Sequence, residues 1–305
     1  MVSLPAGMAV LERGWLSSNN VVFTQGDAHA VVDTGYRNHV PQTLALIDQA
    51  LGGDPLHHIV NTHLHSDHAG GNAALQARYP QVRTTIPPGL SEAVKAWDDV
   101  ALSYRPTGQL CDRFVHDDTL VVDGSVRLGP YDWTVLPADG HDADMVMLWC
   151  ETQGVLISAD ALWQNGFGVL FPALNGDLGA FAAQDQTLEL IEQLAPRLVI
   201  PGHGAPFTEV DAALQTARSR LNWLAQDPRR HAQAALKGLL AFTLLDRQHM
   251  PQQDVIDLID HGLMSQPGFK AAFDEAPPQL AQWAVDQLTR VGVARWDGQA
   301  LQSCA

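Results

Sequence analysis

The stretch Asn61-Thr62-His63-Leu64-His65-Ser66-Asp67-His68 places three imidazoles and one carboxylate within its last six positions. Each of these groups costs free energy to bury unless it is paired. A metal ion supplies such a partner, because neutral imidazole binds Zn, Fe, Ni and Cu, and a carboxylate adds a hard oxygen ligand. The stretch therefore predicts a metal site, and the remaining ligands have to come from elsewhere in the chain.

The spacing within this stretch favours two ions rather than one. His63 and His65 are two residues apart, so in an extended segment both side chains point to the same side and can reach one ion. Asp67 and His68 lie just past the expected turn and can reach a second ion.

Three further candidate ligands occur at the ends of apolar runs. His141 follows the strand expected at residues 134–136, Asp160 follows the strand at 155–157, and His203 follows the strand at 198–200. Taken singly, each is an ordinary turn residue. Their occurrence in this order after the histidine-rich stretch indicates one shared site.

Composition limits the classes of protein to consider. The chain has 305 residues, 46% of them hydrophobic, which is enough for one large domain plus a small one. Its formal net charge of −16 argues against nucleic-acid partners, whose binding depends on Lys and Arg. Cys111, Cys150 and Cys304 are widely spaced, so they form neither a disulfide framework nor a thiolate zinc site.

The sequence gives no sign of membrane association. No apolar run approaches the roughly 18–20 residues that a membrane span requires. Residues 1–14 lack the basic segment followed by an apolar segment that is typical of a signal peptide. We therefore expect a cytoplasmic protein with free thiols and no membrane partner.

Hydrophobic patterning predicts two β-rich halves, each closed by helices, and hence two sheets between helical layers. Gly26-Asp27 predicts a hairpin turn between the first two strands. Residues 87–119 are expected to form a helix and a long loop. The expected strands are 21–23, 30–32, 58–60, 119–122, 125–128, 132–136, 145–150, 155–158 and 198–200, and the expected helices are 40–51, 72–79 and 177–194.

The chain beyond about residue 211 has mostly helical spacing. It ends in a short strand, an Asp297-Gly298 turn and another short strand, which together look like a winged-helix module. We therefore predict a catalytic domain over residues 1–225 and a helical, winged-helix-like module over 226–305. The helices expected in this part are 212–224, 228–245, 252–263 and 277–291.

In order and spacing, these motifs resemble those of metallo-β-lactamase-fold hydrolases, in particular glyoxalase-II-like members that carry a helical C-terminal tail. The resemblance implies an α+β fold, an αββα sandwich with a two-metal site at one edge of the sheets. The matching motifs are Val32-Asp33-Thr34-Gly35, His63-x-His65-x-Asp67-His68, Gly140-His141, Ala159-Asp160 and Gly202-His203-Gly204.

The resemblance also implies a division of the ligands between the two ions. His63, His65 and His141 would bind one ion, Asp67, His68 and His203 the other, and Asp160 would bridge them. Asp33 fits either a role in orienting a ligand imidazole or a turn-capping role, and the two do not exclude each other.

Five imidazoles and two carboxylates without a thiolate suit zinc best, with iron or manganese as alternatives. Two divalent ions can share a hydroxide near neutral pH, which would attack a carbonyl carbon or phosphorus. The expected activity is therefore hydrolysis. Asp160 as the bridging residue and Asp67 as a proton relay are the candidate catalytic residues.

The identity of the bond is a separate question. By the resemblance, an aspartate at position 160 favours glyoxalase-II-like thioesterases, lactonases and phosphodiesterases over β-lactamases. Acyl-homoserine lactonases of this fold often carry a tyrosine where this chain has Trp163, which disfavours that activity. The apolar stretch 163–172, with Trp97 and Tyr104, is expected to wall a pocket for a small uncharged acyl substrate. We therefore expect an ester or thioester hydrolase, with a phosphodiesterase or nuclease as the alternative.

A DNA-binding tail is a further alternative, because winged helices often bind DNA. From Pro228 to the end the sequence holds seven Lys and Arg against eight Asp and Glu, which disfavours a basic DNA-reading face. A role in covering the site or in forming a homodimer fits the tail better.

Overall fold

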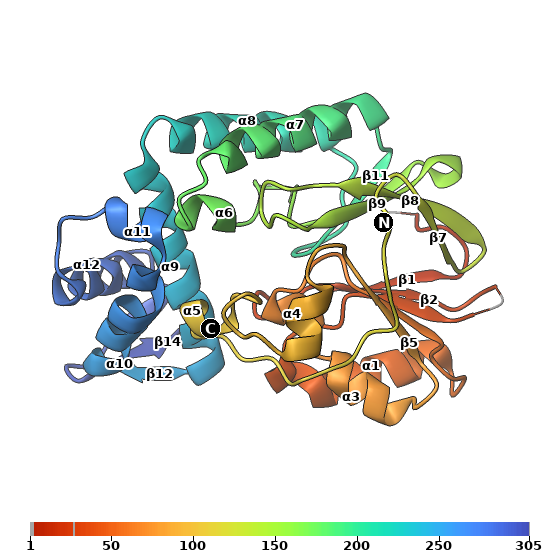
Figure 1. The fold of residues 1–305 in the computed structure, drawn as a ribbon, viewed down its shortest axis with the longest axis horizontal. Helices are drawn as coiled ribbons and strands as arrows, with labels where there is room; N and C mark the ends of the chain where they lie inside the picture. The colour runs from red at the N-terminus through yellow and green to blue at the C-terminus, as the bar shows by residue number, and fades with distance from the viewer. Residues whose placement is uncertain (1–2, 27, 305) are drawn as a thin grey trace.

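The protein folds into two β-sheets packed face to face between two helical layers, with a further helical region at one end (Figure 1). The structure is a computed structural model and describes residues 3–26 and 28–304. The α+β fold with an αββα sandwich, predicted from the sequence, is confirmed. Asp27 of the expected hairpin turn lies outside the described residues, but the strands flanking it pair antiparallel as expected.

The first sheet has the strand order β1-β2-β3-β4-β5-β6. Its first three strands are antiparallel neighbours, whereas β3 to β6 run parallel to one another. The strands are β1 (Met8–Leu11), β2 (Asn20–Phe23), β3 (Ala30–Val32), β4 (His58–Val60), β5 (Arg83–Ile86) and β6 (Asp118–Thr119).

The second sheet has the order β11-β10-β9-β8-β7. β10 pairs parallel with β11, and the other neighbours are antiparallel. As a result β8, β10 and β11 all run in one direction and end at the same edge. The strands are β7 (Ser125–Leu128), β8 (Tyr131–Pro137), β9 (Val146–Cys150), β10 (Val155–Ala159) and β11 (Leu198–Pro201).

Three apolar layers hold the sandwich together. Phe23 of the first sheet meets Trp133 of the second edge to face, with ring centroids 5.6 Å apart. Helices α1 (Val40–Leu51) and α3 (Asn72–Arg78) pack on the outer face of the first sheet. Helices α7 (Gly179–Leu194) and α8 (Val210–Ala225) cover the second sheet.

Several local expectations need correction. The expected strand at 119–122 is cut short, because β6 ends at Thr119 and a turn with Asp123 at φ 62 follows. Three strands were not predicted from the sequence at all: β1, β5 and the strand at 249–251 in the C-terminal region. The expected helix within 87–119 divides into α4 (Ser91–Ala96) and α5 (Tyr104–Thr107). Two more short helices flank the site, α2 (Ser66–Ala69) and α6 (Phe171–Leu174).

The C-terminal region combines helices with a small sheet of order β12-β14-β13. Asp227 begins α9 by accepting a hydrogen bond from the Arg229 N–H, with Pro228 as the first helical residue. The elements are α9 (Pro228–Arg247), β12 (His249–Pro251), α10 (Gln252–Asp257), α11 (Pro267–Ala271), α12 (Pro277–Arg290), β13 (Ala294–Trp296) and β14 (Ala300–Ser303).

The break between α8 and α9 coincides with the predicted boundary at residues 225 and 226, while the division into two domains and the winged-helix assignment stay predictions. Among the described residues, every helix is too short or too polar to cross a bilayer.

Candidate metal centre

The site lies where several strands end. His141 follows β8, Asp160 follows β10 and His203 follows β11, so all three leave the same edge of the second sheet. The histidine-rich stretch follows β4 of the first sheet. Parallel strands bring their carboxyl ends to one edge, which explains how residues so far apart in sequence meet.

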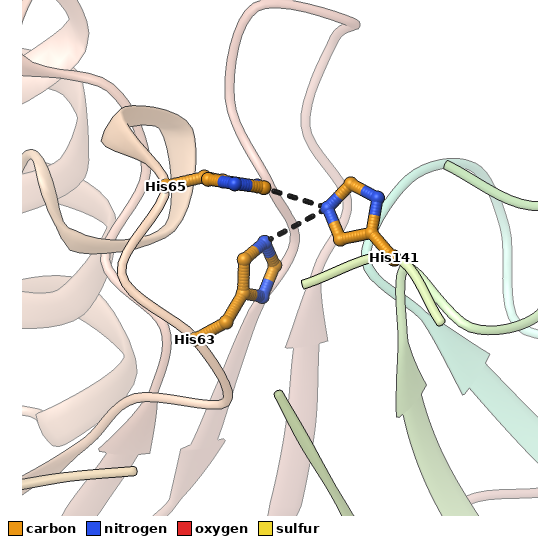
Figure 2. A group of neighbouring side chains, drawn as sticks. All are labelled: His63, His65 and His141. Carbon is orange, nitrogen blue, oxygen red and sulfur yellow. Dashed lines mark hydrogen bonds between the residues drawn. The ribbon is translucent and has the colours of Figure 1, made fainter. Parts of the chain in front are cut away.

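Three imidazoles converge from the two sheets. His141 Nε2 lies 2.9 Å from His65 Nδ1 and 3.3 Å from His63 Nε2, and Figure 2 shows the three rings converging on one point. Nitrogens bound tetrahedrally at about 2.0–2.1 Å from zinc would lie roughly 3.3 Å apart. The spacing of His63, His65 and His141 is therefore suited to one small divalent ion.

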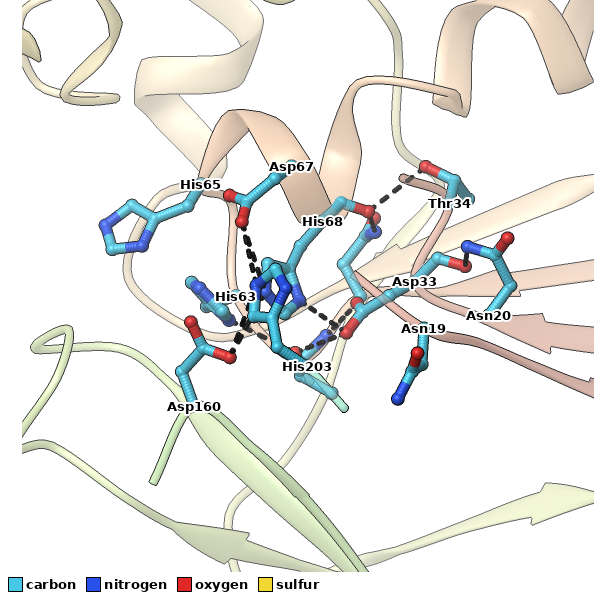
Figure 3. A network of polar contacts seen from close by, with 12 residues as sticks. Asn19, Asn20, Asp33, Thr34, His63, His65, Asp67, His68, Asp160 and His203 are labelled. Carbon is cyan, nitrogen blue, oxygen red and sulfur yellow. Dashed lines mark hydrogen bonds and ion pairs between the residues drawn. The ribbon is translucent and has the colours of Figure 1, made fainter. Parts of the chain in front are cut away.

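A second group lies beside the first and contains the carboxylates. His203 Nε2 is 3.0 Å from Asp67 Oδ2, and His68 Nε2 is 3.9 Å from the same oxygen. The candidate ligand atoms of Asp67, His68 and His203 all lie within 4.8 Å of one another. Figure 3 shows these side chains pointing toward a common point next to Asp160.

Asp160 lies between the two groups and turns a different oxygen to each. Its Oδ2 is 3.5 Å from His141 Nε2, while its Oδ1 is 3.5 Å from His68 Nε2 and 3.9 Å from His203 Nε2. The structure thus brings together all seven residues predicted from the sequence. We call this set the polar cluster: His63, His65, Asp67, His68, His141, Asp160 and His203.

One nitrogen in the polar cluster tests whether a metal fits. His68 Nε2 is fully buried and has no hydrogen-bond partner among the described residues. Its other nitrogen, Nδ1, donates to Asp33 Oδ2 at 2.8 Å. A buried polar nitrogen left without a partner costs free energy, and a divalent cation that takes the place of a proton at Nε2 would satisfy it. The donor set therefore fits metal ions.

Burial keeps three imidazoles neutral, which is the form that binds a metal. Desolvation lowers the pKa of His65 and of His141 to about 4, in each case against nearby carboxylates that raise it. Desolvation and the neighbouring imidazoles also lower the pKa of His63 far below its usual range.

The second group is electrostatically different. Burial lowers the pKa of His68, but Asp33, Asp160 and Asp67 outweigh it and raise that pKa well above the usual range. Burial raises the pKa of Asp160, but His68, His203 and His141 hold it well below the usual carboxyl value. The group therefore collects negative charge, which favours a cation at this point.

Asp33 orients part of the polar cluster. Besides His68 Nδ1, it accepts hydrogen bonds from the Thr62 N–H (2.9 Å) and the Thr62 hydroxyl (2.7 Å). Asp33 has a left-handed φ of 57°, a conformation that costs energy for a residue other than glycine. The orienting role considered from the sequence matches this geometry, and it fixes which His68 nitrogen faces the cluster.

Two glycines make room for the cluster. A Cβ on Gly202 would collide with Asp160 Oδ1, and a Cβ on Gly168 would collide with His141 Nδ1. Glycine is thus required at both positions because the backbone approaches a candidate ligand closely. This accounts for the glycine that precedes His203 in the sequence motif.

Asn19 is a structural contributor that the sequence analysis missed. Its side-chain amide donates to the carbonyl oxygens of Pro201 (3.0 Å) and Gly204 (2.7 Å), while its own N–H donates to the carbonyl oxygen of Gly202 (2.7 Å). These hydrogen bonds hold the loop that carries His203 in place. The Asn19-Asn20 pair after Ser17-Ser18 gives no signal of this role in the sequence.

One side of the pocket above the polar cluster is apolar. Part of this side was predicted, because Trp163 and Phe171 belong to the stretch 163–172. Two residues expected there lie elsewhere: Trp97 and Tyr104 pack with Phe114 in a separate core. We call the lining side chains the apolar wall: Trp15, Trp163, Val169, Phe171, Leu239 and Phe242.

The wall residues missed from the sequence come from two distant segments. Trp15 precedes β2, and Leu239 and Phe242 belong to α9. The Trp15 ring lies 5.2 Å from both the Trp163 and the His203 ring, measured between centroids. In α9 the apolar spacing predicts a buried face but not what that face covers.

Comparison with curated proteins gives relatives of modest identity. A probable metallo-hydrolase, YqjP, of Bacillus subtilis is 25% identical over 240 residues, covering 69% of this chain and 74% of the relative. A hydroxyacylglutathione hydrolase of Bdellovibrio bacteriovorus is 29% identical over 142 residues, 47% of this chain and 46% of that protein.

Solved structures share the fold over nearly the full length. A metallo-beta-lactamase family protein from Thermus thermophilus has a TM-score of 0.58 at 17% identity, covering 99% of this chain and 100% of that one. A beta-lactamase domain protein from Burkholderia ambifaria also has a TM-score of 0.58, at 20% identity, covering 100% and 94%. At such identities the likeness establishes the fold alone.

A family model extends the comparison to the motifs themselves. It covers residues 13–203, more than half of the chain, and this range includes Asp33 and all members of the polar cluster. The chain therefore belongs to the metallo-beta-lactamase superfamily, whose members are metal-dependent hydrolases.

Proposed function

We propose that the protein is a dinuclear-metal hydrolase that cleaves an ester or thioester bond of a small acyl substrate. The observation that carries this proposal is the position of Asp160, which presents one carboxylate oxygen to His141 and the other to His68 and His203. Such a carboxylate can bridge two ions. Zinc suits the donors best, with iron or manganese as alternatives.

In this proposal the polar cluster divides into two ligand sets. His63, His65 and His141 hold one ion, while Asp67, His68 and His203 hold the other. The ligand atoms of His63, His68 and Asp160 also lie within 4.8 Å of one another, so geometry alone does not restrict His63 to the first set. When bound, two divalent ions supply a nucleophile at neutral pH from water and stabilise the negative charge that develops on the substrate oxygen.

Asp67 is the residue best placed to move a proton. Burial raises its pKa, but His68 and His203 outweigh this and lower it, so Asp67 stays a carboxylate at neutral pH. In the proposed reaction a bond forms from the water oxygen to the acyl carbon, and the bond to the leaving oxygen or sulfur breaks. Asp67 accepts the proton from the water and returns it to the leaving group.

The surroundings favour an uncharged acyl substrate over a phosphodiester. Among the described residues that line the pocket at the polar cluster, none is a lysine or an arginine. An adjoining hollow carries Asp142, Asp144 and Asp177, which would repel an anionic group. Apart from the proposed metal ions, the pocket offers a phosphodiester or a nucleic acid no cationic side chain, which disfavours the phosphodiesterase or nuclease alternative.

Arginines in and near the tail are occupied elsewhere. Arg218 pairs with Glu192, and Arg229 pairs with Glu275. Arg220 donates to the Phe167 carbonyl oxygen at 2.9 Å. A relative named as a hydroxyacylglutathione hydrolase supports a thioester bond. However, all three of these arginines already have partners, so none of them is free to recognise an anionic glutathione group.

The test combines metal analysis with a substrate panel. We expect close to two metal ions per chain by mass spectrometry, and turnover of acyl esters or acyl thioesters but not of bis-nitrophenyl phosphate or short RNA. A His63→Ala, His65→Ala double variant should lose the activity. His261→Ala is the matched control, because this imidazole is 75% exposed and lies in the tail.

Full activity in the double variant would falsify the proposal. Turnover of the phosphodiester in place of the acyl substrates would establish the alternative instead. Gel shifts with DNA at low salt, where electrostatic binding is strongest, should stay negative.

A further inference from the structure

The pocket at the polar cluster is too small for a whole substrate. Its volume is about 80 Å³, whereas sites for small molecules usually measure about 300–1,000 Å³. It has room for the reacting bond and little more. The rest of a substrate must therefore extend into a neighbouring hollow, and two such hollows share lining residues with the pocket.

The first neighbouring hollow does not suit an apolar group. It shares His65 and Phe171 with the pocket and carries Asp142, Asp144 and Asp177. Burying a hydrocarbon against these groups would remove water from the carboxylates, which costs free energy.

The second neighbouring hollow is apolar, and we call it the tail groove. It shares Trp15 and Gly238 with the pocket and has a volume of about 580 Å³. Lys237 is the one charged side chain among the described residues that line it. The groove runs between α9 and the end of α12, and its apolar lining includes Ala241, Leu245, Leu288, Val291 and Val293.

Exposure of large apolar side chains marks the tail groove as a surface that lacks a partner. Trp15 is 48% exposed, Val291 69% and Val293 41%. Contiguous exposed apolar surface next to a site indicates that something apolar binds there. The continuity with the pocket identifies the substrate itself as that partner.

Gly238 lies at the junction of the pocket and the tail groove. It is inside α9, where glycine is destabilising relative to alanine. A Cβ at this position would meet only Val169 Cγ2, at 4.0 Å, so crowding does not explain the glycine. The absence of a side chain therefore leaves space at the point where the two hollows share a lining residue.

We propose that the tail groove binds the apolar acyl chain of the substrate, with the ester or thioester carbonyl at the polar cluster and the chain passing over Gly238. This inference rests on the proposed function and names its substrate class. From Gly238 to Leu245 α9 advances about 10 Å. A hydrocarbon chain with bonds of about 1.5 Å advances roughly 1.3 Å per carbon, so this length accommodates about eight carbons.

The first test measures kcat/KM for p-nitrophenyl esters or acyl thioesters with chains from two to twelve carbons. Each methylene placed in the groove should raise kcat/KM by roughly twofold to fourfold, and the rise should stop near eight carbons. A wild-type profile that is flat with chain length would overturn the inference while leaving the proposed hydrolase in place.

Two variants locate the chain. Gly238→Leu fills the junction and should lower the ratio of octanoyl to acetyl kcat/KM at least tenfold. Val291→Asp puts a charge on the far part of the groove and should lower the same ratio. Val121→Asp is the matched control, because Val121 is also 69% exposed but lies outside the groove. Equal ratios in Gly238→Leu and wild type would contradict the proposal.

A binding measurement separates the groove from the chemistry. Titration with 1-decanol should change tryptophan fluorescence saturably in the wild type, through Trp15, whereas 1-butanol should not. The change should be lost in Trp15→Phe and in Gly238→Leu. If no acyl substrate is hydrolysed but decanol binds in this pattern, the proposed function fails and the groove stands as an alkyl-chain site.

A second copy of the chain is the competing occupant of the groove. Light scattering of wild type and Val291→Asp tests it directly. A dimer that Val291→Asp dissociates, with an unchanged chain-length profile, would assign the groove to a subunit interface and overturn the proposal.

Discussion

The polar cluster and the apolar wall are two sides of one pocket, but they are held in place by different interactions. Members of the polar cluster follow strand ends, with Asp67 and His68 in the short helix α2, and are fixed by hydrogen bonds such as His68 to Asp33. The apolar wall comes from loops, from α6 and from α9, and packing holds most of it in position, although Trp163 Nε1 also donates a hydrogen bond to Asp160 Oδ1 at 3.1 Å. If the proposed function holds, chemistry should depend on the sandwich, and substrate choice should depend on the wall, to which the tail contributes Leu239 and Phe242.

The change with the largest expected effect removes the bridging charge from the polar cluster. Asp160→Asn keeps the shape of the side chain but leaves one oxygen that can face only one ligand group. We expect kcat/KM to fall about a thousandfold, since a metal ion contributes several kcal/mol of charge stabilisation. Metal analysis should show the loss of about one ion per chain. An unchanged metal content with full activity would mean that Asp160 does not bridge.

A change under the apolar wall should affect stability rather than chemistry. His231 of α9 accepts a hydrogen bond from the Leu170 N–H at 3.2 Å and is 4% exposed. Burial, followed by the charge of Arg220, lowers its pKa to about 4. The unfolded chain, with a histidine pKa near 6.5, therefore binds a proton that the folded chain excludes.

The sign of the pH effect follows from this difference. Stability linked to His231 is complete above pH 6.5 and is lost as the pH falls from 6.5 toward 4, by about 3 kcal/mol in total. His231→Gln keeps an acceptor for Leu170 and cannot titrate. Denaturant unfolding at pH 7 and at pH 4.5 gives the unfolding free energy at each pH. The decrease between the two pH values should be smaller in the variant than in the wild type. If the variant and the wild type lose the same amount of unfolding free energy, His231 is already protonated in the folded state.

The sequence predicted the polar cluster more completely than the apolar wall, for a physical reason. An imidazole cluster such as His63 to His68 has few explanations other than a ligand, so its residue types alone are informative. Strand ends such as those before Asp160 and His203 are recognisable because apolar runs stop there. The sandwich followed from the same runs, although β1 and β5 were too weakly patterned to predict.

The apolar wall resisted prediction because apolar side chains serve cores and pockets alike. Trp97 and Tyr104 looked like pocket residues, but the Tyr104 hydroxyl donates to the Leu64 carbonyl oxygen and both rings pack with Phe114. Phe242 lies in the helix expected at 228–245, and it lines the pocket, which the helical spacing did not indicate. Which surface a helix covers depends on contacts between distant segments, and the helical spacing does not record them.

A smaller effect on chemistry should follow from the support beneath the polar cluster. Asp33→Asn leaves one acceptor oxygen for the His68 and Thr62 donors that Asp33 now satisfies. Loss of such a supporting contact typically lowers metal affinity or activity about 10–100-fold. We expect this loss in kcat/KM, with weaker binding at one metal. Thr152→Ser, at the far end of β9 and β10 from the cluster, should behave as wild type.

The smallest expected effect concerns the contact between the sandwich and α9. The Tyr36 hydroxyl donates to Asp246 Oδ2 at 3.1 Å and accepts from the Leu110 N–H at 3.3 Å, and the Tyr36 ring packs edge to face on Phe242 of the apolar wall. Burial and then Asp246 raise the pKa of Tyr36 well above its usual value, so the hydroxyl stays protonated.

Tyr36→Phe removes that hydroxyl but keeps the ring against Phe242. We expect a loss of about 1 kcal/mol in unfolding free energy, because the Leu110 N–H and Asp246 lose a partner. If the tail sets substrate choice, KM for a long-chain substrate should rise while the metal content stays at the wild-type value. A loss of metal instead would mean that α9 supports the polar cluster itself, and the division of the pocket into a catalytic side and a selective side would not hold.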